Sequence, residues 1–427
     1  MNVLFISRYG DSLSLAKRVR DEGHREFFYI LDQKASSVGE GIVRRVGREV
    51  RVANERGEPS PRNILRLLRD CSPELVVFDM VGLGKVASHI REMGYPVFGA
   101  GLWADNAELD RAYGYKLMKA AGIKTPPTYV FGKGEYEKAI EFVKREGKRF
   151  VYKPSGNLPV GHTYVARGVD DMVEMLRLWK SEAEFELQEY IDGVEVSCEL
   201  WWNGFSSFLH NITMEEKRFM EGNIGPNIGC AGNVVKAVSK KHRIVSEGVG
   251  RMERLLRKTS YRGPLDLNSI VNEDGLFGLE FTARFGYDAV QALLELYKGS
   301  LTRLLFSIAT GSSPEEELTG DCSIAVRLSI PPYPHSDDAV KGIPILGVED
   351  EKHIWFGDAM KREGKYVSAG ADGCVCSVTA RGENVRECRR RAYRTVSNLI
   401  IPQVQYRRDI GTRFTEDFAL LRKLQYL

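Results

Sequence analysis

The chain of 427 residues lacks a cysteine framework. Its seven cysteines are scattered, and none forms a Cys-x-x-Cys pair. An odd number without regular spacing indicates a reducing compartment and mostly buried thiols. The sequence also shows no N-terminal signal peptide, because Met1 leads directly into an apolar strand. No apolar run approaches the ~20 residues that span a membrane. We therefore expect a cytoplasmic protein without membrane segments.

A strong charge of either sign is also missing. The formal net charge is +3, from 61 basic and 58 acidic residues. The basic residues do not gather into a long tract interleaved with aromatics, so nucleic-acid binding is not implied. The composition, 43% apolar and 28% charged, is that of an ordinary globular protein. The length predicts about two to four domains. Without repeats or low-complexity linkers, we expect them to pack on each other.

The N-terminal part has no Gly-x-Gly-x-x-Gly fingerprint after its first strand, which excludes a Rossmann dinucleotide site. Its continuous apolar strands alternate with helices, which predicts a parallel, doubly wound sheet. Ligands of such sheets bind at the carboxyl ends of the strands, here residues 8–11 and 79–84. The first of these is expected to be at most a substrate-side loop. The strands are predicted at 2–7, 27–31, 74–79 and 96–98.

One short apolar strand carries three polar side chains. Within Leu279–Gly286 (LEFTARFG), Glu280, Thr282 and Arg284 alternate, so the period of two puts them on one face. This set suits a divalent cation beside a phosphate, because oxygen ligands suit Mg²⁺ and an arginine fork suits phosphoryl oxygens. The alternative is an amphipathic edge strand with a solvated, salt-bridging face.

The central region contains a second candidate for phosphate binding. Strand 149–153 ends in Lys153, and the glycine-containing loop Pro154–His162 follows it, which suits a nucleotide phosphate. The alternative is that the loop glycines only form turns. Residues 214–232 are predicted to form a long irregular loop, of the kind that is usually functional or disordered. Strands are expected at 185–191, 195–202, 205–212 and 263–271, and helices at 105–121, 135–146, 240–258 and 289–308.

The C-terminal part predicts a mixed unit of strands and one long helix. We therefore expect a parallel doubly wound α/β domain at 1–104, a central domain at 105–319 and a small mixed α+β domain at 320–427. The C-terminal strands are predicted at 323–330, 352–356, 366–369 and 374–380, and the helix at 384–398.

Four segments, taken in order, carry a resemblance to a known family. They are EYIDGVEVS (189–197), EEKRFMEGNIGPNIGCAG (215–232), LEFTARFG (279–286) and RAYRTVSNL…YRRDIG (391–411). Over nearly its whole length the chain resembles the ATP-grasp ligases, and most closely the phosphoribosylamine–glycine ligase family of purine biosynthesis. The resemblance implies a central ATP-grasp fold and an ATP-dependent carboxylate–amine ligase. In such an enzyme ATP phosphorylates a carboxylate, and an amine displaces phosphate from the acyl phosphate to leave an amide.

The resemblance also implies the ligands. These are ATP with Mg²⁺ or Mn²⁺ and small-molecule amine and carboxylate substrates, bound to a monomer or homodimer. Lys153 would neutralise the α- and β-phosphates, and Glu195 would accept hydrogen bonds from the ribose. The backbone of a hinge, made of Gln188, Glu189, Tyr190 and Ile191, would pair with the adenine edge. Arg111 stands where many members carry a lysine that binds ATP phosphate, and Lys116 is a nearby substitute.

The same resemblance implies metal ligands and catalytic residues. Glu280 would hold the metal, with Thr282 beside it and Asn268 as partner on the neighbouring strand. Asp266, which points the same way two residues earlier, is the rival of Asn268. Arg284 would stabilise the transferring phosphoryl group. Lys217, Arg218 and Asn227 lie on the loop that covers substrate and phosphate in the family. As alternatives, Lys153 is a surface lysine, and Glu195 and the Lys217-Arg218 pair are solvated charges.

The sequence departs from the family pattern mainly in the acceptor half. Thr282 stands where the family has asparagine, and a hydroxyl is a poorer Mg²⁺ ligand than an amide oxygen. We therefore expect a divergent member with an altered amine or acid substrate. A catalytically inactive nucleotide-binding or partner-binding relative is the alternative, and a phosphotransferase without ligation is a third hypothesis. The other departures are Arg8–Ser12, Asp79–Leu83, Gly161-His162, Tyr287-Asp288-Ala289 and Asp372–Cys376.

Overall fold

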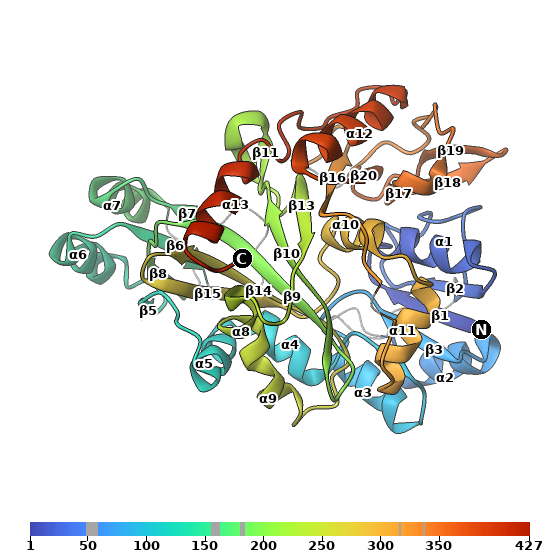
Figure 1. Ribbon diagram of the computed structural model, residues 1–427, viewed down its shortest axis with the longest axis horizontal. Coiled ribbons are helices and arrows are strands. Elements are labelled where there is room, and N and C mark those ends of the chain that lie inside the picture. Colours follow the sequence, from blue (N-terminus) through green and yellow to red (C-terminus); the bar gives the residue numbers. More distant parts are fainter. Residues whose placement is uncertain (48–58, 155–162, 180–183, 316, 336–337) are drawn as a thin grey trace.

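The N-terminal part forms a parallel sheet with the strand order β2-β1-β3-β4. The computed structural model describes all residues except 48–58, 155–162, 180–183, 316 and 336–337 (Figure 1). Helices return the chain to the same edge after each strand, which confirms the predicted doubly wound arrangement. The elements are β1 (Asn2–Ser7), α1 (Leu13–Asp21), β2 (Arg25–Ile30), α2 (Pro61–Cys71), β3 (Leu75–Phe78), α3 (Gly84–Glu92) and β4 (Val97–Phe98).

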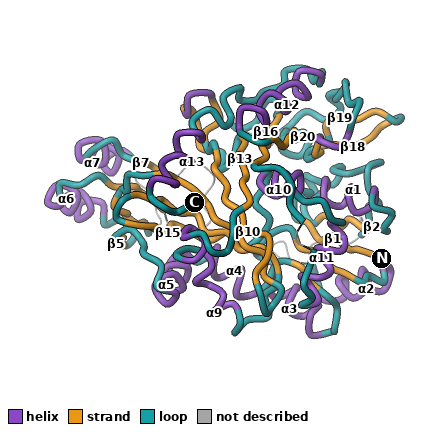
Figure 2. The backbone as a smooth tube through the Cα atoms, viewed as in Figure 1, coloured by secondary structure: helices purple, strands orange, loops and turns teal. Residues whose placement is uncertain are grey.

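A large antiparallel sheet of eight strands forms the centre of the molecule (Figure 2). Its order is β15-β14-β9-β10-β13-β16-β20-β17, so strands of the central and C-terminal regions share one sheet. Large apolar side chains of its strands, such as Trp201 and Phe281, are buried. The strands are β9 (Val194–Trp202), β10 (Ser207–Glu215), β13 (Gly232–Ala237), β14 (Gly263–Asn272), β15 (Gly275–Thr282), β16 (Cys322–Leu328), β17 (Ile354–Phe356) and β20 (Cys376–Gly382).

A small sheet with the order β5-β8-β6-β7 projects from one end of the molecule and is covered by two helices (Figure 1). It has an apolar core of its own, in which the Phe185 ring stacks on Phe131 and Tyr136. The apolar core of this unit is therefore separate from that of the large sheet. Its elements are β5 (Thr128–Phe131), α6 (Tyr136–Glu146), β6 (Phe150–Pro154), β7 (Tyr164–Val165), α7 (Val169–Leu178) and β8 (Phe185–Glu189).

Three predicted helices are interrupted. Residues 105–121 divide into α4 (Leu102–Leu109) and α5 (Arg111–Ala121), because Asp110 leaves the helix and caps α5 through the Tyr113 N–H. Residues 289–308 divide at Ser300, which caps the second helix in the same way. Residues 240–258 form only short turns. The remaining pieces are α8 (Arg243–Ser246), α9 (Glu253–Leu256), α10 (Ala289–Leu296) and α11 (Leu301–Thr310).

The prediction of an irregular loop at 214–232 is wrong. The segment forms a hairpin of β11 (Arg218–Met220) and β12 (Ile224–Asn227), joined by a turn in which Gly222 and Asn223 adopt positive φ. Gly and Asn tolerate this conformation, which explains why the turn forms there. The Gly222 N–H also donates to Asp409 near the C-terminus at 2.9 Å. The hairpin is therefore held by residues far away in the sequence.

The C-terminal part adds a helix and a second hairpin at the β16–β20 end of the large sheet, and a last helix that packs against β9. Among the described residues, no helix has both the length and the apolar character needed to cross a membrane. The predicted boundary after residue 104 falls within α4, and the one after 319 lies before β16. The elements are β18 (Ala359–Arg362), β19 (Lys365–Ser368), α12 (Val385–Asn398) and α13 (Phe414–Lys423).

Candidate functional site

The strand singled out in the sequence forms the edge of the large sheet and alternates as predicted. Phe281, Ala283 and Phe285 are buried, whereas Glu280 is exposed and Thr282 half-buried. In register, Glu280 lies opposite Asn268 and Thr282 opposite Asp266. On the next strand of the sheet, β9, Ser197 lies opposite Asn268 and Glu199 lies opposite Asp266. This side of the sheet, which we call the polar face, carries Glu195, Ser197, Glu199, Glu215, Asp266, Asn268, Glu280 and Thr282.

Lys217 supplies a positive charge to the polar face. Its Nζ lies 2.7 Å from Glu195 Oε1 and 3.9 Å from Glu215 Oε2, and it donates to Asn268 Oδ1 at 3.3 Å. Burial lowers the pKa of Lys217, but Glu195 and Glu215 outweigh this and raise it. Lys217 in turn lowers the pKa of Glu195. Lys217, Glu195 and Asn268, predicted from separate segments, are thus brought together.

Lys153 faces this group from the small sheet. It ends β6, is 8% exposed, and donates to Gln188 Oε1 at 2.8 Å. Burial lowers the pKa of Lys153 to about 8, although Glu280 acts in the opposite direction. A buried lysine between two sheets is not the solvated surface lysine of the alternative interpretation. Residues 155–162, including the predicted phosphate loop, lie outside the described residues.

Arg111 lies beside Lys153. Its Nη1 donates to the Pro154 carbonyl at 3.2 Å and lies 3.7 Å from Glu186 Oε2. Arg111 is also among the charges that act on Lys153. Lys116 is five residues further along α5 and therefore lies on a different face of the helix. The geometry favours Arg111 over its substitute.

The predicted adenine hinge is the end of β8, the strand between β5 and β6. The N–H groups of Glu189 and Tyr190 already donate to the carbonyls of Pro127 and Arg149, both at 2.9 Å. The Glu189 side chain binds Lys148, and the Tyr190 ring packs under a guanidinium. Within the described part of the chain, the Ile191 N–H makes no such bond. Of these three hinge N–H groups, that of Ile191 is the one that could donate to a ligand.

The predicted metal ligands are hard oxygen donors on adjacent strands, as Mg²⁺ requires. Glu280 and Asn268 lie directly opposite each other, and Asn268 Nδ2 donates to Asp266 Oδ2 at 3.3 Å. Asn268 and its rival Asp266 therefore lie side by side on the polar face. No group of three His, Cys, Asp or Glu side chains placed to hold a metal occurs among the described residues. A cation there would thus combine carboxylate with amide or hydroxyl oxygens.

The remaining predicted catalytic residues are less closely gathered. Arg284 donates through Nε to Glu108 Oε1 at 2.9 Å, and its guanidinium lies over the Tyr287 ring, 5.5 Å from the centroid. It therefore stands beside the polar face rather than on it. Arg218 and Asn227 pair with each other across the β11–β12 hairpin. Arg218 donates to Gly225 O and Asn227 accepts from Gly229 N–H, and among the described residues no side-chain hydrogen bond or ion pair joins either to the Lys217 ammonium group.

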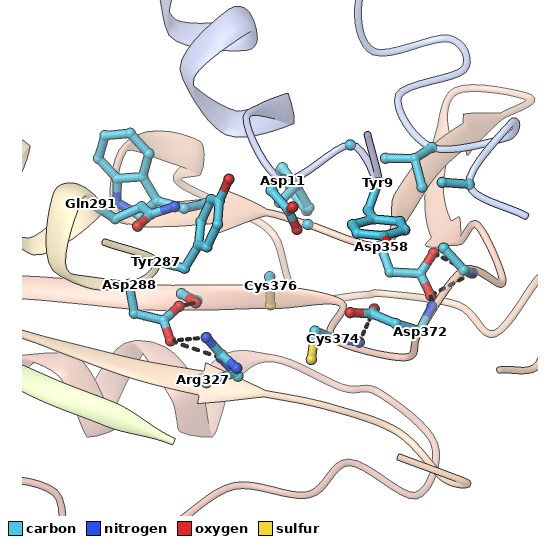
Figure 3. A pocket seen from close by; sticks show the side chains of 18 of the residues that line it. Tyr9, Asp11, Tyr287, Asp288, Gln291, Arg327, Asp358, Asp372, Cys374 and Cys376 are labelled. Carbon is cyan, nitrogen blue, oxygen red and sulfur yellow. Dashed lines mark hydrogen bonds and ion pairs between the residues drawn. The ribbon is translucent and has the colours of Figure 1, made fainter. Parts of the chain in front are cut away.

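A cavity of about 480 Å³ opens on the other side of Tyr287 (Figure 3). N-terminal residues line it from one side, and residues of α10, β16 and β20 line it from the other. Sequence reasoning pointed to its first loop, at 8–11, but named none of its residues as a site. One signal was available, because three of the segments that depart from the family pattern meet here. Its polar lining residues include Asp11, Asp32, Asp288, Gln291, Arg327, Asp358 and Asp372.

Two family models match the chain. Residues 109–289 match the ATP-grasp (A) domain of phosphoribosylglycinamide synthetase, and residues 323–413 match the C domain of the same protein. The first match contains the polar face, Lys153 and the hinge. The second contains the C-terminal strands of the large sheet and much of the cavity wall.

Individual relatives agree with these matches. Phosphoribosylamine–glycine ligase of Streptomyces coelicolor is 30% identical over 342 residues, which cover 77% of this chain and 80% of that protein. The Lactococcus lactis protein of the same name is 24% identical and covers 97% and 100%. The crystal structure of the Thermotoga maritima protein superposes with a TM-score of 0.70 at 21% identity, over 96% of this chain and 100% of that one. A biotin carboxylase from Campylobacter jejuni shares the fold at 11% identity, with a TM-score of 0.68 over 99% and 96%. The chain therefore belongs to the phosphoribosylamine–glycine ligase family of ATP-grasp enzymes.

Proposed function

We propose that this protein is an ATP-dependent carboxylate–amine ligase that binds ATP between the small sheet and the polar face. The observation that carries the proposal is that Lys153, on the small sheet, lies within the electrostatic reach of Glu280, on the edge of the large sheet, and of Lys217, just after β10. A buried lysine opposite oxygen ligands is the arrangement that a triphosphate and its metal require. Family membership supports the same chemistry.

In this proposal the nucleotide is held along its whole length. Lys153 and Arg111 bind the phosphates, and Glu195 accepts hydrogen bonds from the ribose. The Ile191 N–H, at the end of the hinge, donates to the adenine edge. Lys217 currently pairs with Glu195 at 2.7 Å, so ribose binding would compete with this ion pair.

Glu280, Asn268 and Thr282, with Asp266 close by, would hold Mg²⁺ or Mn²⁺. The metal would neutralise charge on the phosphate oxygens. A carboxylate oxygen of the acid attacks the γ-phosphorus, the bond to the β-phosphate oxygen breaks, and ADP leaves. Arg284, beside the polar face, would stabilise the transferring phosphoryl group. The amine nitrogen then attacks the acyl carbon, the bond to the phosphate oxygen breaks, and phosphate leaves as the nitrogen loses a proton.

Glu280→Gln tests this function. We expect the variant to fold normally but to form no ADP, because a neutral amide cannot replace a charged metal ligand. ADP release is measured with Mg-ATP, first with glycine and phosphoribosylamine and then with a panel of amines and amino acids. Glu273→Gln, in the exposed turn of the same β-hairpin, is the matched control and should retain activity. Full activity of Glu280→Gln would contradict the mechanism, and ATP binding without turnover by the wild type would favour an inactive relative.

We also infer which segments of the chain bind the nucleotide and which bind the acceptor. Residues 105–319 would bind the nucleotide, whereas 1–104 and 320–427 would together hold the acceptor. The cavity supports this division, because its walls come from the two outer segments and from the end of the central one.

A further inference from the structure

The cavity beside Arg284 has an excess of negative charge. Five aspartates line it, against one lysine and one arginine. Tyr9 and Asp11 enter from the N-terminal loop, and Arg327 of β16 faces them together with Asp358 and Asp372 from C-terminal loops (Figure 3). A cavity of this composition attracts cations and repels phosphate esters.

Two groups that could hold a phosphate, the Arg327 guanidinium and a pair of backbone N–H groups, are already engaged. Arg327 Nε and Nη2 both lie 2.7 Å from Asp288 Oδ2. The backbone N–H groups of Ala371 and Gly373 form a nest, which binds anions in many proteins, but Asp358 occupies it. Its carboxylate accepts from Ala371 at 2.9 Å and from Gly373 at 2.8 Å. A phosphate bound in the nest or on Arg327 would have to displace a carboxylate of the protein itself.

Acceptors, in contrast, remain available. Gln291 lines the cavity, is 6% exposed, and its Oε1 has no hydrogen-bond partner among the described residues. A buried oxygen without a donor costs free energy unless a ligand supplies one. Within the same described part, no hydrogen bond or ion pair engages the Asp11 carboxylate. The Gln291 amide oxygen and the Asp11 carboxylate can therefore both accept hydrogen bonds from a ligand that carries N–H donors.

The walls of the cavity are aromatic. Tyr9, Tyr287, Trp355 and Phe356 line it together with the aspartates. Aromatic faces attract ammonium groups and pack against methylene chains. The combination of rings with separated carboxylates suits a ligand whose charges are spaced along an apolar chain.

We propose that this cavity is the amine site of the ligase and binds an aliphatic diamine or polyamine that carries no phosphate. The inference rests on the proposed function, since it names the amine for the same reaction. The Arg284 guanidinium packs on Tyr287, which lines the cavity, so an amine bound here adjoins the phosphoryl site. Burial, together with the charges of Asp79 and Asp372, raises the pKa of Asp11 to about 7. Asp11 can therefore accept the proton that the attacking nitrogen loses near neutral pH.

Titration calorimetry of the full-length protein tests the inference with spermidine as probe and ribose 5-phosphate as comparison. About 0.15 M salt limits surface adsorption, because the screening length is then only about 8 Å. We expect spermidine to bind and ribose 5-phosphate not to bind. Asp11→Asn and Asp372→Asn should each weaken spermidine binding about tenfold or more. Asp70→Asn, on the exposed face of α2, should leave it unchanged. Equal affinity in all three variants, or preferential binding of ribose 5-phosphate, would overturn the inference.

Gln291→Met separates ligand binding from folding. Removing the unpartnered Oε1 should leave the melting temperature equal or higher, because the buried amide is lost. Spermidine affinity should nevertheless fall several-fold. A variant that melts at or above the wild-type temperature and binds spermidine normally would contradict the role of Gln291 and with it the site.

A second titration shows whether a failure concerns the amine site or the proposed ligase function. The non-hydrolysable ATP analogue adenylyl imidodiphosphate, with Mg²⁺, is titrated into the same samples. If the analogue binds and spermidine does not, the amine assignment fails while the nucleotide site stands. If spermidine binds and the analogue does not, the ligase proposal fails, and the cavity is a polyamine site of another kind. If neither binds, both are overturned.

Discussion

Lys153 illustrates how one residue connects the two sheets of the nucleotide site. Its ammonium group is held by Gln188 and attracted by Glu280, yet burial lowers its pKa to about 8. The free protein therefore begins to lose the charge on Lys153 just above neutral pH. Phosphate oxygens need that charge, so nucleotide binding should favour the protonated lysine and take up a proton at alkaline pH.

The prediction at this site is a loss of nucleotide affinity as the pH rises. Between pH 7 and pH 9 the Kd for adenylyl imidodiphosphate with Mg²⁺ should rise up to about tenfold, because a group with a pKa of about 8 is mostly neutral at pH 9. Lys153→Arg should remove this dependence, since arginine stays charged. Calorimetry at both pH values measures it. A wild-type Kd that is constant over this range would contradict the role of Lys153.

The residues of the site differ in how far the sequence predicts them. The alternation of Glu280 and Thr282 follows from strand geometry alone, and the structure confirms it, whereas β15 ends at Thr282 and Arg284 lies beyond the strand. Asp11 and Gln291 could not be found in this way, because they come from loops and helices that only the packing of distant segments brings together. Local periodicity places a side chain on a face, but it does not show which other element meets that face.

At the scale of elements, the β11–β12 hairpin also shows that local sequence patterns do not reveal contacts with distant segments. Its strands are short, and the residues that hold them lie near the C-terminus. Arg407 donates to the Arg218 carbonyl at 2.9 Å, and its Nη2 lies 3.2 Å from Glu216 Oε2. Both side chains of this ion pair are almost completely buried. A chain that depends on such distant partners has no local signal for strands, which explains why the sequence indicates a loop.

Two neighbouring arginines provide a matched test of this anchoring. Arg407→Ala should lower the free energy of unfolding by about 3–5 kcal/mol, because it leaves the buried Glu216 carboxylate with less compensation. Arg408→Ala removes an exposed ion pair with Glu221 and should leave the urea midpoint close to wild type. Urea unfolding followed by circular dichroism compares the two. Equal midpoints for both variants would show that the buried pair does not anchor the hairpin.

The helices give a second lesson at this scale. The predicted helix at 240–258 breaks into short turns around Gly248 and Gly250, where a Cβ would lie 2.5 Å from the Ile244 carbonyl and 2.7 Å from the Val245 carbonyl. The apolar spacing of the segment is compatible with a helix, but close packing against the backbone requires glycine instead. For this helix, apolar spacing predicted that helical segments occur, but not where they begin and end.

For the molecule as a whole, the contact between the N-terminal part and the rest decides whether the cavity exists. Glu22, just after α1, caps α11 from the outside. Its carboxylate accepts from Ser300 Oγ and Leu301 N–H at 2.7 Å and from Thr302 N–H at 3.0 Å. A carboxylate at the beginning of a helix is favoured by the orphan N–H groups and by the helix dipole. Nearby, Lys17 of α1 pairs with Glu351 at 2.8 Å.

Glu22→Gln should therefore destabilise the molecule in a pH-dependent way. Burial raises the pKa of Glu22, but the hydrogen bonds from Thr302, Ser300 and Leu301 outweigh it, so the pKa is lowered. A carboxyl group whose pKa is lowered by folding stabilises the folded state at pH values above its pKa in the unfolded chain. This contribution is lost as the pH falls through the pKa of the folded state. We expect a loss of about 2 kcal/mol in the free energy of unfolding at pH 7, measured with urea.

The difference from wild type should shrink as the pH falls through the lowered pKa of Glu22 in the folded protein, because the wild-type carboxyl then becomes protonated as well. Glu92→Gln, whose side chain is 76% exposed at the end of α3, is the control and should change little at either pH. A constant difference between Glu22→Gln and wild type from pH 7 down to pH 3.5 would mean that the charge of Glu22 does not hold the N-terminal part in place. Because the cavity is built across this contact, spermidine affinity at pH 7 should fall together with stability in Glu22→Gln and stay unchanged in Glu92→Gln.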